Sequence, residues 1–301
     1  MSKAESKRAQ NTLSRLKDTL ICPRCSEKLS LNQDRFQCNN CRITFPSISG
    51  IPFLFSHPNE TLGEWKLKFN HLQQNLLVNA EECELAGGPP RLVMANALRA
   101  QAEKIGALLG PLLTAKVVPR SWHVAAQTRL PDSLELLSYS SNLFRDWVWG
   151  DDENKKSVDA ILKVCHAKPA KRVLVLGAGG GRLAYDLHLS WKPDVTVACD
   201  INPLSTIIAK KVCEGESVEL YEFPRTPISA EASAILQTLK APQPTTGIEF
   251  VTTNALRHPF MKGSFDRVVT PWFVDIVPEK FPVLCQRINA LLAEGGEWVQ
   301  F

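Results

Sequence analysis

The sequence predicts an α/β protein in which helices cover both faces of a mainly parallel sheet, with a helical region and a small cysteine-rich module ahead of it. Three observations point to this fold class. A buried strand over 171–177 runs into a glycine turn and then a helix over 183–189. A second strand, 195–199, ends at Asp200. Two Cys-X-X-Cys pairs lie near the amino terminus.

Length and composition restrict the class of protein. The chain has 301 residues, with 44% hydrophobic and 22% charged residues. This composition is ordinary for a globular protein and excludes the disordered and collagen-like classes. No apolar run approaches the roughly 18 residues of a membrane span, and residues 1–20 lack a signal-peptide core. We therefore expect a cytoplasmic protein.

We expect three segments: a cysteine-rich module over 1–56, a helical linker or insertion over 57–133, and an α/β domain over 134–301. Basic charge is concentrated in the first segment, where nine Lys and Arg residues accompany four Asp and Glu residues. The whole chain has a formal charge of +4, so the remainder is close to neutral. An attraction to nucleic acid would therefore come from the first segment.

Four of the nine cysteines have the spacing of a zinc site. Cys22 and Cys25 form one pair, Cys38 and Cys41 form the other, and the residues between the pairs can form a short hairpin. Four thiolates at this spacing can converge tetrahedrally on one zinc ion. Accidental or redox-active thiols are the alternative, but a redox pair is expected beside a βαβ unit, and the sequence pattern here contains none.

The apolar residues of 43–55 are expected to form the strand and small core of this module, with metal binding supplying the folding energy that a short chain lacks. The stretch 20–55 resembles the short zinc ribbons that accompany methyltransferase domains. Both this resemblance and the closed set of four thiolates imply a structural metal, because no coordination position stays open for chemistry.

The region between the module and the sheet has helical periodicity. Over 61–113 we expect two or three helices, broken at 87–90 and at 110–111. A further break at 119–131 leads to 134–150, where aromatic and charged residues are crowded. This last segment is either a helix that packs on the next domain or a lid over a ligand.

The glycine turn indicates the class of ligand. Glycines at 177 and 179–181 allow a tight turn and let a nucleotide-like ligand approach the amides at the helix start. Asp200 can accept both hydroxyls of a ribose. The dinucleotide fingerprint needs a small residue where this chain has Arg182, and no P-loop motif is present. A sulfonium nucleoside without phosphates remains.

These motifs resemble those of the class I S-adenosylmethionine-dependent methyltransferases over about the last half of the chain. The matching segments are VLVLGAGGGR (173–182), CDINP (199–203), EFVTTNALRHPF (249–260), FDRVVTPWFVD (265–275) and LLAEGGEWVQF (291–301). Within that superfamily the chain is most similar to carnosine N-methyltransferase-like proteins, which share the FRDW segment (144–147), the Gly-Arg-Leu after the glycines, a long insertion (214–247) and the acid that ends the fourth-strand motif. The resemblance implies a Rossmann-like fold.

The resemblance also implies roles for individual residues. Asp200 would bind the ribose, and Asn254 would lie at the adenine edge, where an amide can both donate and accept. The alternative role of Asn254 is that of a turn residue after a strand. The residues expected to line the methionine moiety are Gly177, Gly179 and Gly181.

Three further residues are candidates for the site. Arg182 would pair with a carboxylate, either that of the cofactor or one that caps local structure. Asp275 ends the fourth-strand motif, where a carboxylate can hold a substrate amine or imidazole and accept its proton. Its alternative role is to cap a helix that begins near Pro278. His258 is a minor candidate, since its loop setting is more typical of a packing residue.

Residues 297–301 are expected to form the fifth strand. Members of the resembled family continue through two more strands, so this strand would be an apolar edge unless another chain or an unusual ending covers it. We therefore expect the sheet to lack its C-terminal strands, the domain to be incomplete and its thermal stability to be weak.

Taken together, these motifs predict an S-adenosylmethionine-dependent methyltransferase that modifies a nitrogen of a small molecule, such as a histidine-containing peptide. Methyl transfer from a sulfonium depends mainly on alignment of the reacting atoms. Two alternatives stay open: an RNA base methyltransferase that docks through the basic zinc ribbon, and a non-catalytic protein that binds a partner. The expected cofactors are S-adenosylmethionine and structural zinc, and no membrane partner is expected.

Overall fold

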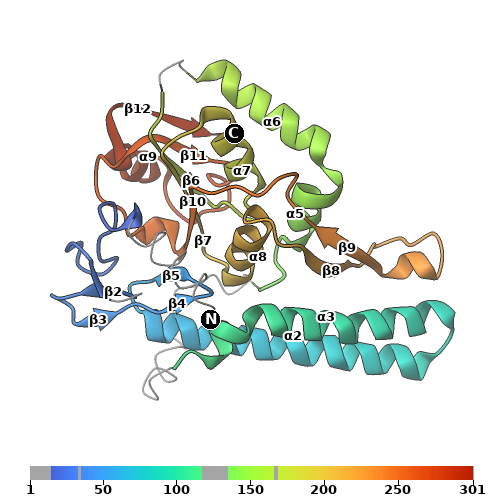
Figure 1. Cartoon of the computed structure of the whole chain (residues 1–301). Helices are drawn as coiled ribbons and strands as arrows, with labels where there is room; N and C mark the ends of the chain where they lie inside the picture. Colours follow the sequence, from blue (N-terminus) through green and yellow to red (C-terminus); the bar gives the residue numbers. More distant parts are fainter. Residues whose placement is uncertain (1–14, 33–34, 117–134, 166–168, 301) are drawn as a thin grey trace.

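The computed structural model describes residues 15–32, 35–116, 135–165 and 169–300. A central sheet has helices on both sides, and a long helical pair extends beside it (Figure 1). None of the helices in these described ranges combines the length and apolar character that a membrane crossing requires.

Five parallel strands form most of the sheet, in the order β10-β7-β6-β11-β12. Their bounds are β6 (Arg172–Leu176), β7 (Val195–Asp200), β10 (Ile248–Thr253), β11 (Phe265–Thr270) and β12 (Leu292–Gln300). The strand order reverses at β6, which has β7 on one side and β11 on the other. Such a reversal opens a crevice at the carboxyl ends of the strands. The predicted Rossmann-like fold is confirmed.

Helices cover both faces of this sheet, as predicted. Because side chains alternate along a strand, Val173 and Val175 of β6 lie on one face and Leu174 and Leu176 on the other. The first face packs against α6 (Asp151–Val164), α7 (Arg182–Trp191) and α8 (Pro203–Cys213). The second packs against α9 (Phe281–Leu291) and the cysteine-rich module.

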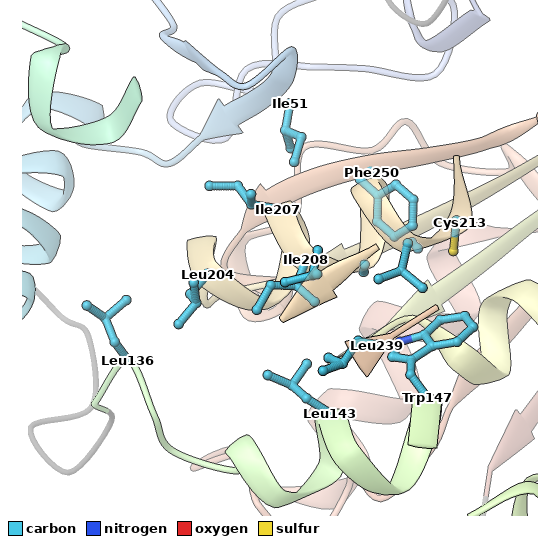
Figure 2. Close-up of a cluster of buried hydrophobic side chains, with 14 of the residues drawn as sticks. Ile51, Leu136, Leu143, Trp147, Leu204, Ile207, Ile208, Cys213, Leu239 and Phe250 are labelled. Atoms are coloured by element: carbon cyan, nitrogen blue, oxygen red, sulfur yellow. The ribbon is translucent and has the colours of Figure 1, made fainter. Parts of the chain in front are cut away.

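The core on the first face is continuous with the segments outside the sheet. Figure 2 shows the side chains of α8, including Ile207 and Ile208, between Ile51 of the amino-terminal module and Trp147. These four residues belong to one buried cluster, although they come from three widely separated parts of the chain. The α/β domain therefore shares its core with the segments that precede it.

The cysteine-rich module is a small antiparallel sheet of β1 (Ser30–Asn32), β2 (Arg35–Cys38) and β3 (Ile43–Thr44). The hairpin expected between the two cysteine pairs is formed by β1 and β2. Two backbone hydrogen bonds join the module to the α/β domain: Ile21 N donates to Pro259 O at 2.8 Å, and Met261 N donates to Thr19 O at 2.8 Å.

The expectation that 43–55 forms the module's own core is wrong for its second half. β4 (Ser47–Ile48) and β5 (Ile51–Leu54) extend the large sheet beyond β10, which makes it seven-stranded. β5 runs parallel to β10, with Phe53 paired to Thr252. Phe53 and Leu54 are fully buried: Phe53 lies in the cluster on the first face of the sheet, and Leu54 lies in the cluster on the second face, which also contains Phe45 of the module.

The helical region is an antiparallel pair, α2 (Pro58–Ala86) and α3 (Pro89–Thr114). The predicted break at 87–90 is confirmed, with Gly87 and Gly88 at positive φ between the helices. The predicted break at 110–111 is wrong, since Pro111 lies inside α3. Proline removes one backbone donor, and this loss disrupts a helix less near its last turn than in its middle. The predicted break at 119–131 lies outside the described residues.

The long insertion at 214–247 contains an antiparallel hairpin of β8 (Val218–Glu222) and β9 (Ile235–Leu239), with a short 3₁₀ turn, η2 (Glu231–Ser233), between them. Figure 1 shows this hairpin beside α3. Tyr221 N donates to Gln101 Oε1 at 2.7 Å, and Lys104 forms an ion pair with Glu219 at 2.8 Å. The insertion thereby connects the helical pair to the α/β domain.

The predicted fifth strand corresponds to β12, which lies at one edge of the sheet and pairs with β11. Trp298 Nε1 donates to Thr270 Oγ1 at 2.8 Å, and the Trp298 ring lies 6.2 Å from that of Phe281. These contacts join Trp298 to the neighbouring strand β11 and to α9. Whether further strands belong beside β12 stays a prediction.

Candidate functional site

A cavity of about 810 Å³ lies at the carboxyl ends of β6, β7, β10 and β11. This is the crevice that the reversal of strand order opens, and its volume is within the range of about 300 to 1,000 Å³ typical of small-molecule sites. Most of its lining comes from the segments that follow the four strands: 177–180 and 183 after β6, 200–202 and 205 at and after the end of β7, 253–256 at and after the end of β10, and 271–273 and 275–278 after β11. The rest comes from part of 138–157, which precedes β6 in the sequence.

The glycine turn after β6 forms one wall of the cavity. Gly177 and Gly179 have φ of 69° and 53°, in the left-handed region that glycine adopts without strain. A Cβ on Gly177 would lie 2.8 Å from Phe273, so a side chain there would also collide with the neighbouring turn. A Cβ on Gly179 would meet no atom within 4 Å, which leaves that face of the turn open.

Asp200 ends β7 beside the glycine turn. Its Oδ2 accepts from Gly179 N at 2.9 Å and its Oδ1 accepts from Asn202 N at 2.9 Å. A carboxylate has about four acceptor positions, so these two hydrogen bonds leave acceptor capacity for a ligand hydroxyl. Burial raises the pKa of Asp200, and the backbone N–H donors oppose that rise. The arrangement fits a group that accepts from a ribose diol.

Asn254 follows β10 and lines the cavity. Its Oδ1 accepts from Leu256 N at 2.9 Å and so caps η3 (Ala255–Arg257). The turn role considered as the alternative is therefore present, and it fixes the orientation of the amide. Asn202 lies at the equivalent position after β7, where its amide donates to Leu136 O at 2.9 Å. Asn202 also lines the cavity, although the sequence analysis did not single it out.

The turn after β11 forms the opposite wall. Asp275 is exposed and lines the cavity, and it does not cap a helix, because α9 begins at Phe281 with Lys280 before it. Trp272 has φ of 43°, a conformation that is strained for a bulky residue. The guanidinium of Arg145 lies 4.8 Å from the Trp272 ring centroid.

The segment before α6 supplies the third wall; in the sequence it is the crowded aromatic and charged patch that contains the FRDW motif. It consists of α5 (Ser140–Phe144) and a π-helical turn, η1 (Arg145–Trp149). The Arg145 guanidinium donates to Asp146 Oδ1 at 2.8 Å, and both side chains line the cavity. Burial raises the pKa of Asp146, although Arg145 lowers it in part. The segment packs on the domain, as the first alternative has it, and also lines the cavity; its role as a lid over a ligand stays a prediction.

Two of the predicted cofactor residues lie behind the cavity wall. The described residues that line the cavity include neither Gly181 nor Arg182. A Cβ on Gly181 would lie 2.8 Å from the Ala209 side chain, so this glycine allows α8 to pack closely. Arg182 forms ion pairs with Asp151 at 2.9 Å and with Asp186 at 2.8 Å. The carboxylates that it contacts therefore belong to the protein.

The four predicted zinc ligands are brought together. The sulfur atoms of Cys22, Cys25, Cys38 and Cys41 all lie within 4.8 Å of one another. A tetrahedron with Zn–S bonds of about 2.3 Å has sulfur–sulfur edges of about 3.8 Å, so the cluster fits the ion. The residue after each pair has positive φ, 62° at Ser26 and 54° at Arg42, so the two knuckles share one backbone geometry.

His258 lies away from the cavity, beside the module. Its ring stacks on Phe260 with centroids 6.1 Å apart. Burial lowers its pKa to about 4, and the nearby Arg287 adds to this shift. This setting is that of a packing residue.

Neither a known protein-family model nor a curated protein matches the chain. Solved structures match about half of it. The YcgJ protein of Bacillus subtilis is 14% identical with a TM-score of 0.35, over 48% of this chain and 50% of that one. Phosphoethanolamine N-methyltransferase 2 of Haemonchus contortus is 17% identical with a TM-score of 0.33, over 48% of this chain and 27% of that one.

A third structure, an S-adenosylmethionine-dependent methyltransferase of Mesorhizobium loti, is 16% identical with a TM-score of 0.33, over 48% of this chain and 51% of that one. The chain thus spans about half or less of the length of these three proteins. Because identity and similarity are this low, the function has to be argued from the residues of the site.

Proposed function

We propose that the chain is an S-adenosylmethionine-dependent methyltransferase. The observation that supports this most directly is the position of Asp200, which is tied to the glycine turn through Gly179 N at 2.9 Å and lines the cavity. A carboxylate at the end of the second strand, beside an open glycine turn without phosphate-binding residues, suits an adenosyl group.

The remaining walls suit the two ends of such a donor. Asn254 follows the next strand, where its fixed amide can contact the adenine edge. Arg145 also lines the cavity; its Nε and Nη2 donate to Asp146, and the remaining N–H groups of the guanidinium can donate to a ligand carboxylate. We assign it to the methionine carboxylate, a role that the sequence analysis had considered for Arg182.

The donor, when bound, would supply a methyl group on a positively charged sulfur. The acceptor nitrogen would form a bond to the methyl carbon while the carbon–sulfur bond breaks, and the electron pair of the broken bond would stay on sulfur. Asp275 lines the cavity, and we assign it to orient the acceptor and to accept the proton that the nitrogen loses. Trp272 adds an aromatic face beside it.

The charge of the cavity favours a small nitrogen compound as acceptor. Among the described residues, the three carboxylates of Asp146, Asp200 and Asp275 line it together with one basic side chain, that of Arg145. An amine or imidazole, including that of a histidine-containing peptide, suits this lining, whereas a polyanion would be repelled. RNA would have to dock through the basic module, and its binding would then weaken strongly with salt.

We also propose that the four-cysteine cluster holds zinc as a structural ion. All four ligands come from the protein, so no position is open for substrate. The ion would fix the two knuckles on either side of the β1–β2 hairpin and so hold the module, from which the chain continues into β4 and β5 of the large sheet.

The proposal is tested by titrating the full chain with S-adenosylmethionine in a calorimeter. We expect binding by the wild-type protein and at least about tenfold weaker binding by Asp200→Asn, because one charged acceptor is lost. Asp266→Asn is the matched control: Asp266 also accepts from two backbone amides, those of Lys171 and Arg172, but at the other end of β6. Equal affinity of Asp200→Asn and wild type, or no binding by the wild type, would overturn the proposal. The latter result would favour the non-catalytic alternative.

A panel of amines, imidazoles and RNA then identifies the acceptor by methyl incorporation. Incorporation into a small nitrogen compound is expected. Salt-sensitive binding and methylation of RNA would reverse this choice of substrate.

A further inference from the structure

The side chain of Arg182 lies outside the cavity but contacts a segment that lines it. We propose that Arg182 is a positioning residue, which sets the affinity for the methyl donor by holding the π-helical turn η1 against the glycine turn. The inference rests on the proposed function, because the turn is what presents Arg145 and Asp146 to the cavity.

The contacts of Arg182 converge on this turn. Its Nη1 donates to the carbonyl oxygen of Asp146 at 2.7 Å and to Asp151 Oδ1 at 2.9 Å, so one nitrogen joins the turn to the start of α6. Its Nε donates to Asp186 Oδ2 at 2.8 Å, which fixes the guanidinium to α7. The guanidinium also lies 5.4 Å from the ring centroid of Trp147. Four contacts on three elements define one orientation of the planar group.

The turn touches the glycine turn directly. Trp147 Nε1 donates to Gly180 O at 2.8 Å, and a Cβ on Gly180 would lie 2.7 Å from Asp146 Oδ2. The wall of the cavity is therefore assembled from two segments about 35 residues apart, and Arg182 begins the helix that follows the second of them. Its side chain connects the helix start to the back of the first segment.

The turn needs such support because its backbone geometry is unusual. Gly150 N donates to Arg145 O at 2.8 Å, the i to i+5 bond of a π-helix. π-Helical turns are rare and frequently occur at functional sites. A Cβ on residue 150 would lie 2.3 Å from Arg145 O, so the turn closes only on a glycine. Contacts from outside the turn must hold it in place.

Burial and partners exclude a direct role in binding for Arg182. Its side chain is 10% exposed, and its hydrogen bonds go to protein oxygens. If substitution of Arg182 lowers the donor affinity, the cause would therefore be a displacement of Arg145 and Asp146, whose side chains line the cavity.

Arg267 is a matched control for Arg182, because it has a similar environment away from the cavity. Arg267 is also buried, donates to Glu297 at 2.8 Å and lies 4.5 Å from the ring centroid of Trp191. It lies near the start of β11, at the end of the sheet opposite to the cavity. Arg182→Lys and Arg267→Lys both keep the charge and remove the planar fork.

The experiment measures donor affinity by calorimetry and backbone hydrogen exchange in the ligand-free protein. For Arg182→Lys we expect at least about tenfold weaker donor binding, equivalent to one charge-assisted hydrogen bond, and faster exchange of the amides of 145–151 alone. Arg267→Lys is expected to bind the donor like the wild type. If Arg182→Lys does not fold, Trp147→Phe is the second variant. It keeps an aromatic ring but removes the hydrogen bond to Gly180 O, and it should also weaken donor binding.

Each result decides the inference. Wild-type donor affinity together with wild-type exchange in Arg182→Lys would overturn the positioning role and leave the proposed function standing. Faster exchange across the whole domain would show a general structural role and also overturn it. A wild-type protein that binds no donor, but whose turn still loosens on substitution, would refute the proposed function and keep the mechanical part of the inference.

Discussion

Trp272 shows how the backbone at the end of β11 is adapted to the cavity. A non-glycine residue in the left-handed region carries strain of about 1 to 3 kcal/mol, and such residues cluster at ligand-binding sites. Here φ is 43° and the side chain is 43% exposed, so the strain is not compensated by complete burial. The contact with Arg145 instead holds the indole at the cavity wall.

We therefore expect Trp272→Gly to separate stability from activity. Its free energy of unfolding should change by less than about 1 kcal/mol, because relief of the strain offsets the lost ring contacts. The kcat/KM for the acceptor should fall at least about tenfold through the loss of the aromatic face. This change should exceed the change in donor affinity, which is affected only through the contact of Trp272 with Arg145. Trp272→Phe, which keeps a ring at the same φ, is the control. Equal losses of donor and acceptor binding in Trp272→Gly would contradict this role.

His258 makes stability depend on pH. Its pKa is about 4 in the folded chain, below its ordinary value of 6.5, because burial disfavours the charged ring. Between these values the unfolded chain binds the proton and the folded chain does not, so the free energy of unfolding rises with pH across this window and falls on acidification through it.

Replacement by a non-titrating residue should remove this dependence. The difference in unfolding free energy between wild type and His258→Asn is expected to shift by at most about 3 kcal/mol between pH 6.5 and pH 4. Denaturant titrations at several pH values measure it, and the zinc cluster, being common to both proteins, cancels in the difference. A constant difference across the window would show that His258 does not titrate there.

Most site residues could be predicted from the sequence because they follow strands. Gly177, Asp200, Asn254 and Asp275 lie at the end of a buried strand or in the turn that follows it, and the carboxyl ends of parallel strands meet at one edge. Arg145 and Asp146 could not be assigned in this way, since their place depends on tertiary contacts with Arg182 and Gly180. The FRDW motif was the available signal, but it does not state which side chains face a ligand.

At the scale of elements, β5 is the strand whose partner the sequence did not reveal. Its residues alternate poorly because all four are buried, and a short apolar run of this kind fits a module core as well as a sheet. Parallel pairing with β10 involves residues about 200 positions away, which no local pattern encodes. The helical pair was predicted more closely, because two adjacent glycines interrupt a strong periodicity.

The pairing of β5 predicts that loss of zinc will destabilise the large sheet as well as the module. Structural zinc contributes on the order of 10 kcal/mol in isolated zinc-finger peptides, and here the module continues directly into β5. We expect Cys38→Ser to lower the bound zinc and to lower the midpoint of a single unfolding transition. Cys285→Ser, outside the cluster, is the control. An unchanged main transition, with the module lost separately, would contradict the coupling.

For the whole molecule, the fold class could be predicted from the hydrophobic periodicity and the positions of the glycines. The way in which the module, the helical pair and the α/β domain pack together could not be predicted from these patterns. The hairpin of β8 and β9 contacts α3 through Gln101 and Lys104, and α8 packs against both the module and the helical pair. In the sequence, each of the surfaces that these contacts join has only the pattern of an ordinary amphipathic face, which does not indicate its partner. The three predicted segments are therefore continuous in their packing.

The place of β5 in the sheet also affects how the chain folds during synthesis. At about 5 to 20 residues per second, β5 leaves the ribosome about 10 to 40 s before β10 is made. Until then the amino-terminal module has an open strand and uncovered apolar side chains, including Phe53 and Leu54. Early metal capture would keep this nascent module compact while the rest of the chain is translated.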